Sequence, residues 1–180
     1  MIILGIDPGT VATGYGAIES DGDRHSLQDY GVVSPMASLS FPEKLYFIHS
    51  ELMKVIAACR PDRMAVENLF YAANVKSALK LGHVRGVAIV AGVSQGIPID
   101  EYSPLEIKQA VVGYGRADKR QVQKMVALLL GLHAPPEPHD AADALAVALC
   151  HAHRFRFAQK VELGSCGGTS RRRATPRAKP

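Results

Sequence analysis

Four acidic residues stand where this chain would otherwise bury apolar side chains. Asp7 and Glu67 each end a short apolar run, and Asp140 and Asp143 open a long apolar segment. No Lys or Arg lies within four positions of Asp7, Asp140 or Asp143. Carboxylates at the ends of buried elements are costly to desolvate unless a positive charge pairs with them. The simplest missing partner is a divalent cation, so this pattern predicts a metal-dependent enzyme.

The order of the apolar segments predicts an α/β fold. Strands are predicted at 2–7, 13–19, 26–33, 63–67 and 97–102, and helices at 41–58, 74–95, 104–112, 118–132 and 139–157. A meander of three strands followed by alternating helices and strands implies a five-stranded mixed sheet flanked by helices on both faces. Sites in such sheets form at the carboxyl ends of the strands, so Asp7 and Glu67 can share one edge. We also expect Gly82, Gly86 and Gly92 to let their helix pack closely against the sheet.

The length of 180 residues suits one domain, and a basic segment follows it. We predict a folded domain over residues 1–157 and a disordered tail over 158–180, because the tail is rich in Gly, Ser, Pro and Arg and cannot form a core. Residues 154–180 carry a net charge of +7 and the whole chain carries +4, so the remaining residues carry −3. The tail is either a solubilising segment or a contact to nucleic-acid phosphates that salt would weaken.

The composition indicates a protein of the cytoplasm. No apolar run approaches the roughly 20 residues that a membrane-spanning helix needs, and the N-terminus lacks a signal-peptide pattern. The three cysteines are scattered and have no metal-ligand spacing. We therefore expect a reducing compartment, no disulfide framework and no membrane partner.

The spacing of the last two acids bears on the chemistry. Asp140 and Asp143 are three positions apart, which places them on one face of a helix start. Capping of that helix explains Asp140 equally well, but it does not explain Asp143, which lies a turn inside. Four converging carboxylates would raise one another's pKa, and hard divalent ions such as Mg²⁺ relieve this. Two such ions about 4 Å apart can activate water and stabilise a leaving oxygen, which predicts hydrolysis of phosphodiesters.

Six motifs follow one another along the chain. They are Gly5-Ile-Asp-Pro-Gly-Thr10 with Thr13-Gly-Tyr-Gly16, Glu67-Asn-Leu-Phe70, Ser77-Ala-Leu-Lys-Leu-Gly82, Arg85-Gly-Val-Ala-Ile-Val90, Lys108-Gln-Ala-Val-Val-Gly113, and Asp140-Ala-Ala-Asp-Ala-Leu-Ala-Val-Ala-Leu-Cys-His151. Together they resemble the RuvC family of crossover junction endonucleases, which are Holliday junction resolvases with an RNase H-like fold. The resemblance covers about residues 1–155 and excludes the tail.

The resemblance implies an endonuclease that acts on four-way DNA junctions in homologous recombination and repair. The metal-binding and catalytic residues of the family fall on Asp7, Glu67, Asp140 and Asp143. The cofactor implied is Mg²⁺, with two ions per subunit and Mn²⁺ as a substitute. A ligand swap from Asp140 to His139 stays open, although neighbouring helix positions point about 100° apart.

The resemblance also implies partners and a cutting pattern. A four-way junction has two-fold symmetry, so paired, symmetric nicks in two strands of like polarity fit a homodimer with C₂ symmetry. The RuvA–RuvB branch-migration complex is the implied protein partner.

Several residues are candidates for holding DNA. Phe70 is either a core aromatic or an exposed ring that stacks on an unpaired base, and the resemblance matches it to an aromatic at the junction centre. Lys108 and Lys119 match positions that contact the DNA backbone. Other basic residues nearby could add phosphate contacts, which position DNA without reading its sequence. The predicted DNA contacts are Phe70, Lys76, Lys80, Lys108, Arg116 and Lys119.

Three other functions compete with this interpretation. Asp7-Pro-Gly-Thr10 also resembles the first phosphate loop of actin-like kinases and ATPases, but 180 residues leave no room for the second lobe of such enzymes. A DNA-binding module without catalysis would gain nothing from four acids facing phosphates. A nuclease of the same fold that cuts RNA–DNA hybrids stays open.

Overall fold

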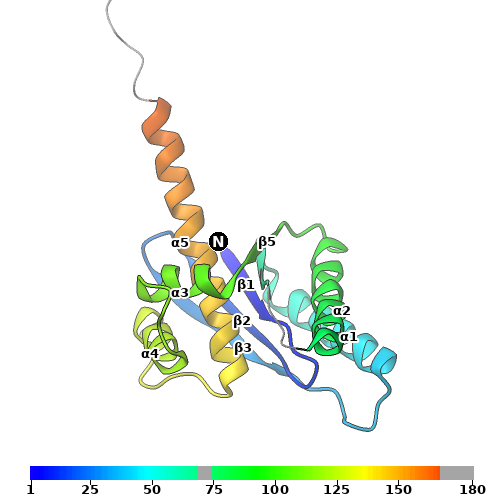
Figure 1. The fold of residues 1–180 in the computed structure, drawn as a ribbon. Coiled ribbons are helices and arrows are strands. Elements are labelled where there is room, and N and C mark those ends of the chain that lie inside the picture. The colour runs from blue at the N-terminus through cyan, green and yellow to red at the C-terminus, as the bar shows by residue number, and fades with distance from the viewer. Residues whose placement is uncertain (69–73, 167–180) are drawn as a thin grey trace, which may run out of the picture.

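A five-stranded mixed sheet organises the chain (Figure 1). The computed structural model describes residues 1–68 and 74–166, with side chains as far as Phe157. The strands are β1 (Ile2–Asp7), β2 (Thr13–Ser20), β3 (His25–Val33), β4 (Arg63–Glu67) and β5 (Ile99–Tyr102). The helices are α1 (Phe41–Cys59), α2 (Val75–Val93), α3 (Pro104–Val112), α4 (Lys119–Leu129) and α5 (His139–Cys166). Each predicted strand and helix is present in this part of the chain.

The strand order places two of the acids at one edge of the sheet. The order is β3-β2-β1-β4-β5, with β2 antiparallel to β1 and β3, β4 parallel to β1, and β5 parallel to β4. In the β1–β4 register Ile6 lies opposite Val66, so the next residues, Asp7 and Glu67, leave the sheet side by side. The predicted mixed sheet is confirmed.

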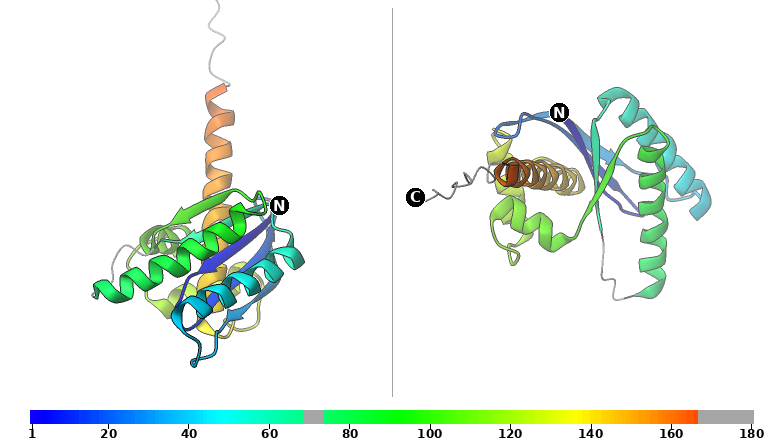
Figure 2. Two further views of the ribbon diagram at one scale, coloured as in Figure 1. Left: turned by 90° about the vertical axis from the view of Figure 1, so that its right-hand side faces the viewer. Right: turned by 90° about the horizontal axis from the view of Figure 1, so that it is seen from above.

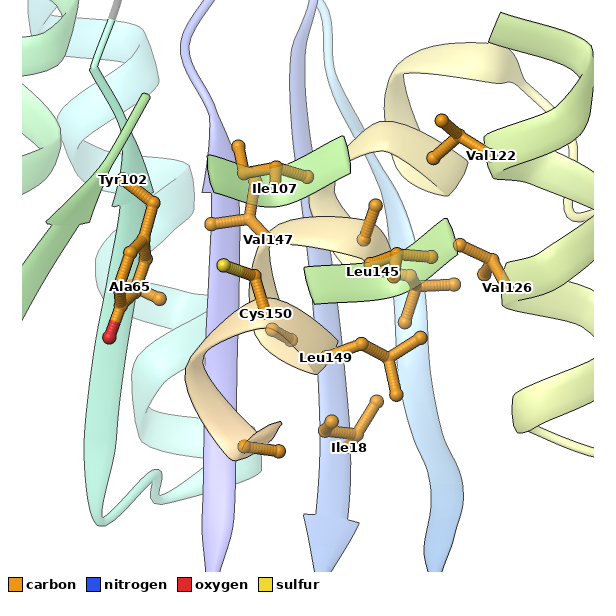
Figure 3. Close-up of a cluster of buried hydrophobic side chains, with 14 of the residues drawn as sticks. Ile18, Ala65, Tyr102, Ile107, Val122, Val126, Leu145, Val147, Leu149 and Cys150 are labelled. Atoms are coloured by element: carbon orange, nitrogen blue, oxygen red, sulfur yellow. The ribbon is translucent and has the colours of Figure 1, made fainter. Parts of the chain in front are cut away.

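Helices cover both faces of the sheet (Figures 1 and 2). α1 and α2 pack against each other over one face, and α5 crosses β1 and β2 on the other face with α3 and α4 packed against it. Successive side chains of a strand point to opposite faces, so β1 supplies both cores. Ile3 lies in the core under α5 that also contains Leu145, which is labelled in Figure 3, and Leu4 lies in the core under α1 with Ile48. Each such fully buried Leu or Ile contributes roughly 1.5–3 kcal/mol.

Glycines in the first two strands let α5 lie unusually close to the sheet. A Cβ atom at Gly14 would stand 2.0 Å from the carbonyl oxygen of Asp140, and one at Gly5 would stand 2.1 Å from that of Ala144. At Gly16 the same atom would lie 2.6 Å from Cγ of Leu145. Any larger residue would therefore push the start of α5 away from the carboxyl end of β1. Close packing of α5 is what brings its acids to the sheet edge.

The glycines of α2 have a different role from the one we expected. Only Gly92 among the three predicted packing glycines approaches the sheet closely, because its Cβ would lie 2.6 Å from Cδ1 of Ile99. A Cβ at Gly82 or Gly86 would meet nothing within 4 Å. The prediction was wrong for these two residues because they lie on the helix face that lines an open groove against α1.

Two predicted boundaries also differ from the structure. β5 begins at Ile99 rather than Ile97, because the Ile97 amide donates to the carbonyl of Gly92 at the end of α2 and Pro98 has no amide to donate. α5 continues past the predicted end at Phe157 to Cys166, and Figure 1 shows this end extending away from the sheet. Residues 158–166 include Ala, Gln, Lys, Glu and Leu, which favour a helix. The division into a domain over 1–157 and a disordered tail over 158–180 stays a prediction.

α5 is long, with 28 residues, but its polar positions are many. Within the described ranges, no helix combines the length and the apolar character needed to cross a bilayer.

Candidate metal centre and nucleic-acid interface

Asp7 and Glu67 form a pair of carboxyl groups at the shared edge of β1 and β4. The pKa of Asp7 is raised to about 9, chiefly by burial and then by the nearby carboxyl groups of Glu67, Asp143 and Asp140. Burial also raises the pKa of Glu67, while a hydrogen bond with Asp7 works in the opposite direction. At neutral pH and without a cation, Asp7 is therefore the protonated partner and donates to Glu67. A cation beside the pair would stabilise the ionised form of both carboxyl groups.

The two acids of α5 complete the cluster. One carboxylate oxygen each from Asp7, Asp140 and Asp143 lie within 4.8 Å of one another, and Glu67 adjoins them through Asp7. The fold thus brings together all four predicted acids from three separate segments. Asp140 is also the acidic residue in the first turn of α5, where it interacts favourably with the helix dipole, so a capping role for Asp140 stays open beside metal binding.

His139 stays outside the oxygen cluster. Its Nδ1 accepts a hydrogen bond of 3.1 Å from the side-chain amide of Gln123, a buried residue of α4. The group of carboxylate oxygens contains the neighbouring Asp140 instead. The geometry therefore favours Asp140 over His139 as a ligand.

Two residues that hold the cluster in place were not singled out from the sequence. Thr13 is fully buried and its Oγ1 donates to the carbonyl of Gly9 at 2.9 Å, which closes the turn that follows Asp7. Gly14 then allows Asp140 to approach, as described above. The motif Thr13-Gly-Tyr-Gly16 could have indicated them, because glycine at every second position of a strand marks a face against which another backbone packs.

Two predicted DNA-binding lysines lie beside the acids. Nζ of Lys119 lies 2.5 Å from Oδ2 of Asp143. Lys119 and Lys108 line a pocket of about 220 Å³ whose walls also include Glu67 and Asp143. Burial raises the pKa of Glu67, and the charges of both lysines oppose that rise. The pocket edge therefore carries negative and positive groups next to each other.

Lys76, Lys80 and Arg116, three other predicted DNA contacts, do not line the pocket beside the acids. Lys76 and Lys80 are exposed in the first turns of α2, and Nζ of Lys80 lies 5.6 Å from the centre of the Phe41 ring. Arg116 is exposed in the turn between α3 and α4. In the described part of the chain, no ion pair joins these three residues to the acidic cluster. Phe70 lies outside the described residues.

The donor set fits a hard divalent cation. Every ligand atom on offer is a carboxylate oxygen, the ligand type that Mg²⁺, Mn²⁺ and Ca²⁺ prefer. Burial, and then the neighbouring carboxyl groups, raise the pKa of Asp7, and a cation beside it would favour its ionised form. A divalent ion held by Asp7, Asp140 and Asp143 would supply that charge.

The sheet and its acids define a class of protein. A five-stranded mixed sheet with carboxylates at the ends of β1 and β4, faced by two more on a crossing helix, is the architecture of the RNase H-like nucleases. The profile of the family described as "Crossover junction endodeoxyribonuclease RuvC" matches residues 3–151. The chain belongs to this family.

Relatives match over almost their entire length. The "Crossover junction endodeoxyribonuclease RuvC" of Ruminiclostridium cellulolyticum is 51% identical over 157 residues, which cover 87% of this chain and 95% of that protein. The Thermus thermophilus RuvC structure matches with a TM-score of 0.81 at 35% identity, covering 88% of this chain and 97% of that one. T. thermophilus RuvC in complex with Holliday junction substrate matches with a TM-score of 0.84 at 36% identity, covering 88% and 96%.

Proposed function

We propose that this chain is an endonuclease that resolves four-way (Holliday) DNA junctions in homologous recombination and repair. It hydrolyses phosphodiester bonds as paired, symmetric nicks in two strands of like polarity. The observation that carries the proposal is the convergence of Asp7, Glu67, Asp140 and Asp143 at one sheet edge beside a pocket with two lysines. The relative solved with a Holliday junction substrate supports DNA junctions as the substrate class.

The proposed cofactor is Mg²⁺, with two ions per subunit and Mn²⁺ as a substitute. Bound at these carboxylates, the ions would activate a water molecule and stabilise the leaving oxygen of the phosphodiester. Asp7, Asp140 and Asp143 would hold them, and Glu67 would join once the proton it shares with Asp7 is lost. The site has only oxygen donors, which supports Mg²⁺ over softer metals.

The proposed DNA-binding residues surround this cluster. Lys108 and Lys119 line the pocket beside the acids, which supports contacts with phosphates next to the cut.

Phe70 follows Glu67 closely in sequence, which supports a stacking role near the junction centre. If so, Phe70→Ala should lower the cleavage rate far more than the melting temperature. A sharp fall in melting temperature with full activity per folded molecule would instead identify a core residue. Weaker phosphate contacts are proposed for Lys76, Lys80 and Arg116.

The active unit is proposed to be a homodimer formed through the groove between α1 and α2. This hollow of about 880 Å³ is larger than the pocket at the acids, and its walls are mainly apolar. Tyr46, Leu79 and Val90 stand 75%, 61% and 59% exposed in it, which is unusual for apolar residues that share one patch. Gly82 and Gly86 leave the surface of α2 open, so a helix of a second copy could approach closely.

A symmetric dimer suits the substrate. The same groove on each subunit would form a self-complementary interface around a two-fold axis, and each subunit would contribute one acidic cluster. Two clusters related by that axis can reach two strands of like polarity in a junction. The RuvA–RuvB complex as partner and the cytoplasm as location are also proposed, and family membership alone supports them.

A panel of substrates tests the choice of function. The protein would be incubated with Mg²⁺ and either a synthetic four-way junction, a linear duplex or an RNA–DNA hybrid, and ATP binding would be measured in parallel. We expect cleavage of the junction well above that of the other two substrates, and no tight binding of ATP. Preferred cutting of the hybrid, or ATP binding without DNA cleavage, would contradict the proposal.

A further inference from the structure

Lys119 forms an ion pair with one of the carboxylates that would bind a metal ion. Its Nζ lies 2.5 Å from Oδ2 of Asp143, and Asp143 belongs to the oxygen cluster with Asp7 and Asp140. The contact joins α4 to α5, so the tertiary fold places the ammonium group there. An oxygen this close to an ammonium is engaged in a charge-assisted hydrogen bond. A cation at the cluster and Lys119 would therefore compete for the same carboxylate.

Lys119 lies at the N-terminus of its helix, where a positive charge is unfavourable. Lys119 is the first residue of α4, whose capping residue Asp118 exchanges hydrogen bonds of 2.9 Å in both directions with Gln121. A positive charge at a helix N-terminus opposes the helix dipole, so local helix stability does not explain a lysine here. The contact with Asp143 offsets that cost. The capping box also holds the backbone of Lys119 while its side chain changes partner.

Lys119 can leave Asp143 without disturbing the core. Its side chain is 55% exposed, whereas that of Asp143 is 23% exposed. It lines the same pocket as Lys108, and no ion pair involving Lys108 is present among the described residues. A phosphate entering this pocket would find one lysine free and the other bound to a ligand carboxylate.

We propose that Lys119 is a resident counter-ion of the metal centre. When a divalent cation binds, the Lys119 side chain leaves Asp143 and forms an ion pair with a DNA phosphate instead. This rests on the proposed nuclease function and deepens it, because it couples the two ligands of the same site. The free protein then binds the cation weakly, since Lys119 must first be displaced. DNA draws Lys119 away and so strengthens cation binding, and by linkage the cation strengthens DNA binding equally.

Metal binding by the free protein tests the first half of this proposal. Mn²⁺ affinity would be measured without DNA, by calorimetry or by electron paramagnetic resonance, for the wild type, Lys119→Met, Lys119→Arg and Lys108→Met. We expect Lys119→Met to bind Mn²⁺ roughly two- to fivefold more tightly, as the loss of one partly exposed ion pair predicts. Lys119→Arg keeps the charge and should stay near the wild type.

The matched control separates direct contact from general charge. Lys108→Met removes the same charge from the same pocket without touching Asp143, so its effect on Mn²⁺ affinity should be clearly smaller. Equal tightening by both methionine variants, or none by Lys119→Met, would overturn the counter-ion role.

The salt dependence of junction binding tests the second half. Junction affinity would be measured across a range of salt concentrations in Ca²⁺, for the wild type and Lys119→Met. Transfer of the ammonium group to a phosphate predicts that the slope of log affinity against log salt falls by about one in the variant. An unchanged slope would show that Lys119 never reaches DNA. Wild-type cleavage in Mg²⁺ is scored separately, so a failure of the nuclease proposal stays distinct from either result.

Discussion

The sheet edge at Asp7 gathers negative charge with too little positive charge nearby, whereas the groove between α1 and α2 exposes apolar side chains with too little to cover them. At the edge, Asp7 holds a proton to a pKa of about 9 because of burial and three neighbouring carboxyl groups. In the groove, Tyr46 and Val90 remain more than half exposed beside Gly82 and Gly86, at which an added Cβ would meet no atom within 4 Å. We propose that each surface is completed by a binding partner, a divalent cation at the edge and a second subunit in the groove.

The two surfaces differ in the kind of partner that would bind to them. The negative charge at the sheet edge favours a small, hard cation, and the ligand atoms of the cluster are all carboxylate oxygens. An apolar groove of about 880 Å³ calls for a protein surface of matching shape. In our proposal, the acidic edge carries the chemistry, and the groove forms the homodimer that brings two acidic clusters to one substrate.

The largest effect is expected at the charged edge. Asp7→Asn should lower junction cleavage by on the order of a thousandfold, equivalent to about 4 kcal/mol of transition-state stabilisation, because it removes a ligand from the centre of the cluster. Junction binding should persist, since Lys108 and Lys119 are untouched. Nicking assays and gel-shift titrations on the same preparations would measure both. Cleavage at the wild-type rate would contradict a metal-binding role for Asp7.

The next effect contrasts a glycine from each surface. Gly14→Ala should destabilise the fold by about 1–3 kcal/mol and weaken Mn²⁺ binding, because its Cβ would stand 2.0 Å from the Asp140 carbonyl. Gly86→Ala is the comparison, made at protein concentrations too low for the proposed dimer because Gly86 lines the groove. No atom lies within 4 Å of the added Cβ there, and alanine favours the helix by up to about 1 kcal/mol. Urea denaturation of both variants measures the difference. Equal stability would mean that α5 does not depend on the close approach.

A smaller effect on chemistry, but a clear one on assembly, is expected from the groove. Val90→Asp should weaken the dimer by about tenfold or more, because a carboxylate would be buried in an apolar interface. Leu128→Asp is the control, since Leu128 is also an exposed apolar residue, on α4, but does not line the groove. Light scattering would give the mass, and junction assays would show unpaired nicks in place of paired ones. A dimer as stable as that of the control would place the interface elsewhere.

The last effect concerns stability alone, as a pH dependence of the metal-free protein. The pKa of Asp7 is about 9 in the folded chain against an ordinary value of 3.8, so between these values the folded state holds a proton that the unfolded state has released. Stability should therefore fall as pH rises from about 4 to 9, by at most about 1.4 kcal/mol per pH unit from this group. Asp7→Asn should flatten the decline, and Mg²⁺ should reduce it. Melting curves in EDTA from pH 5 to 9 would measure it, and identical slopes for wild type and variant would refute it.

The charged edge could be predicted from the sequence and the groove could not. Acids that interrupt apolar runs are visible residue by residue, and the carboxyl ends of parallel strands meet at one edge, so Asp7 and Glu67 were found without coordinates. Gly82 and Gly86 looked like packing residues, yet which face of α2 they occupy depends on how the helix rotates over the sheet. That rotation is decided by tertiary contacts, such as Gly92 against Ile99, which local spacing does not contain. The ion pair of Lys119 with Asp143 was missed for the same reason.

One measurement tests the central claim most directly. A synthetic four-way junction with a label on each strand would be incubated with the protein, with Mg²⁺ and with EDTA, and the cuts would be mapped. We predict paired nicks at symmetric positions in two strands of like polarity, only when Mg²⁺ is present, and none with Asp7→Asn. Cleavage in EDTA, or an intact junction in Mg²⁺ with folded wild-type protein, would contradict the account.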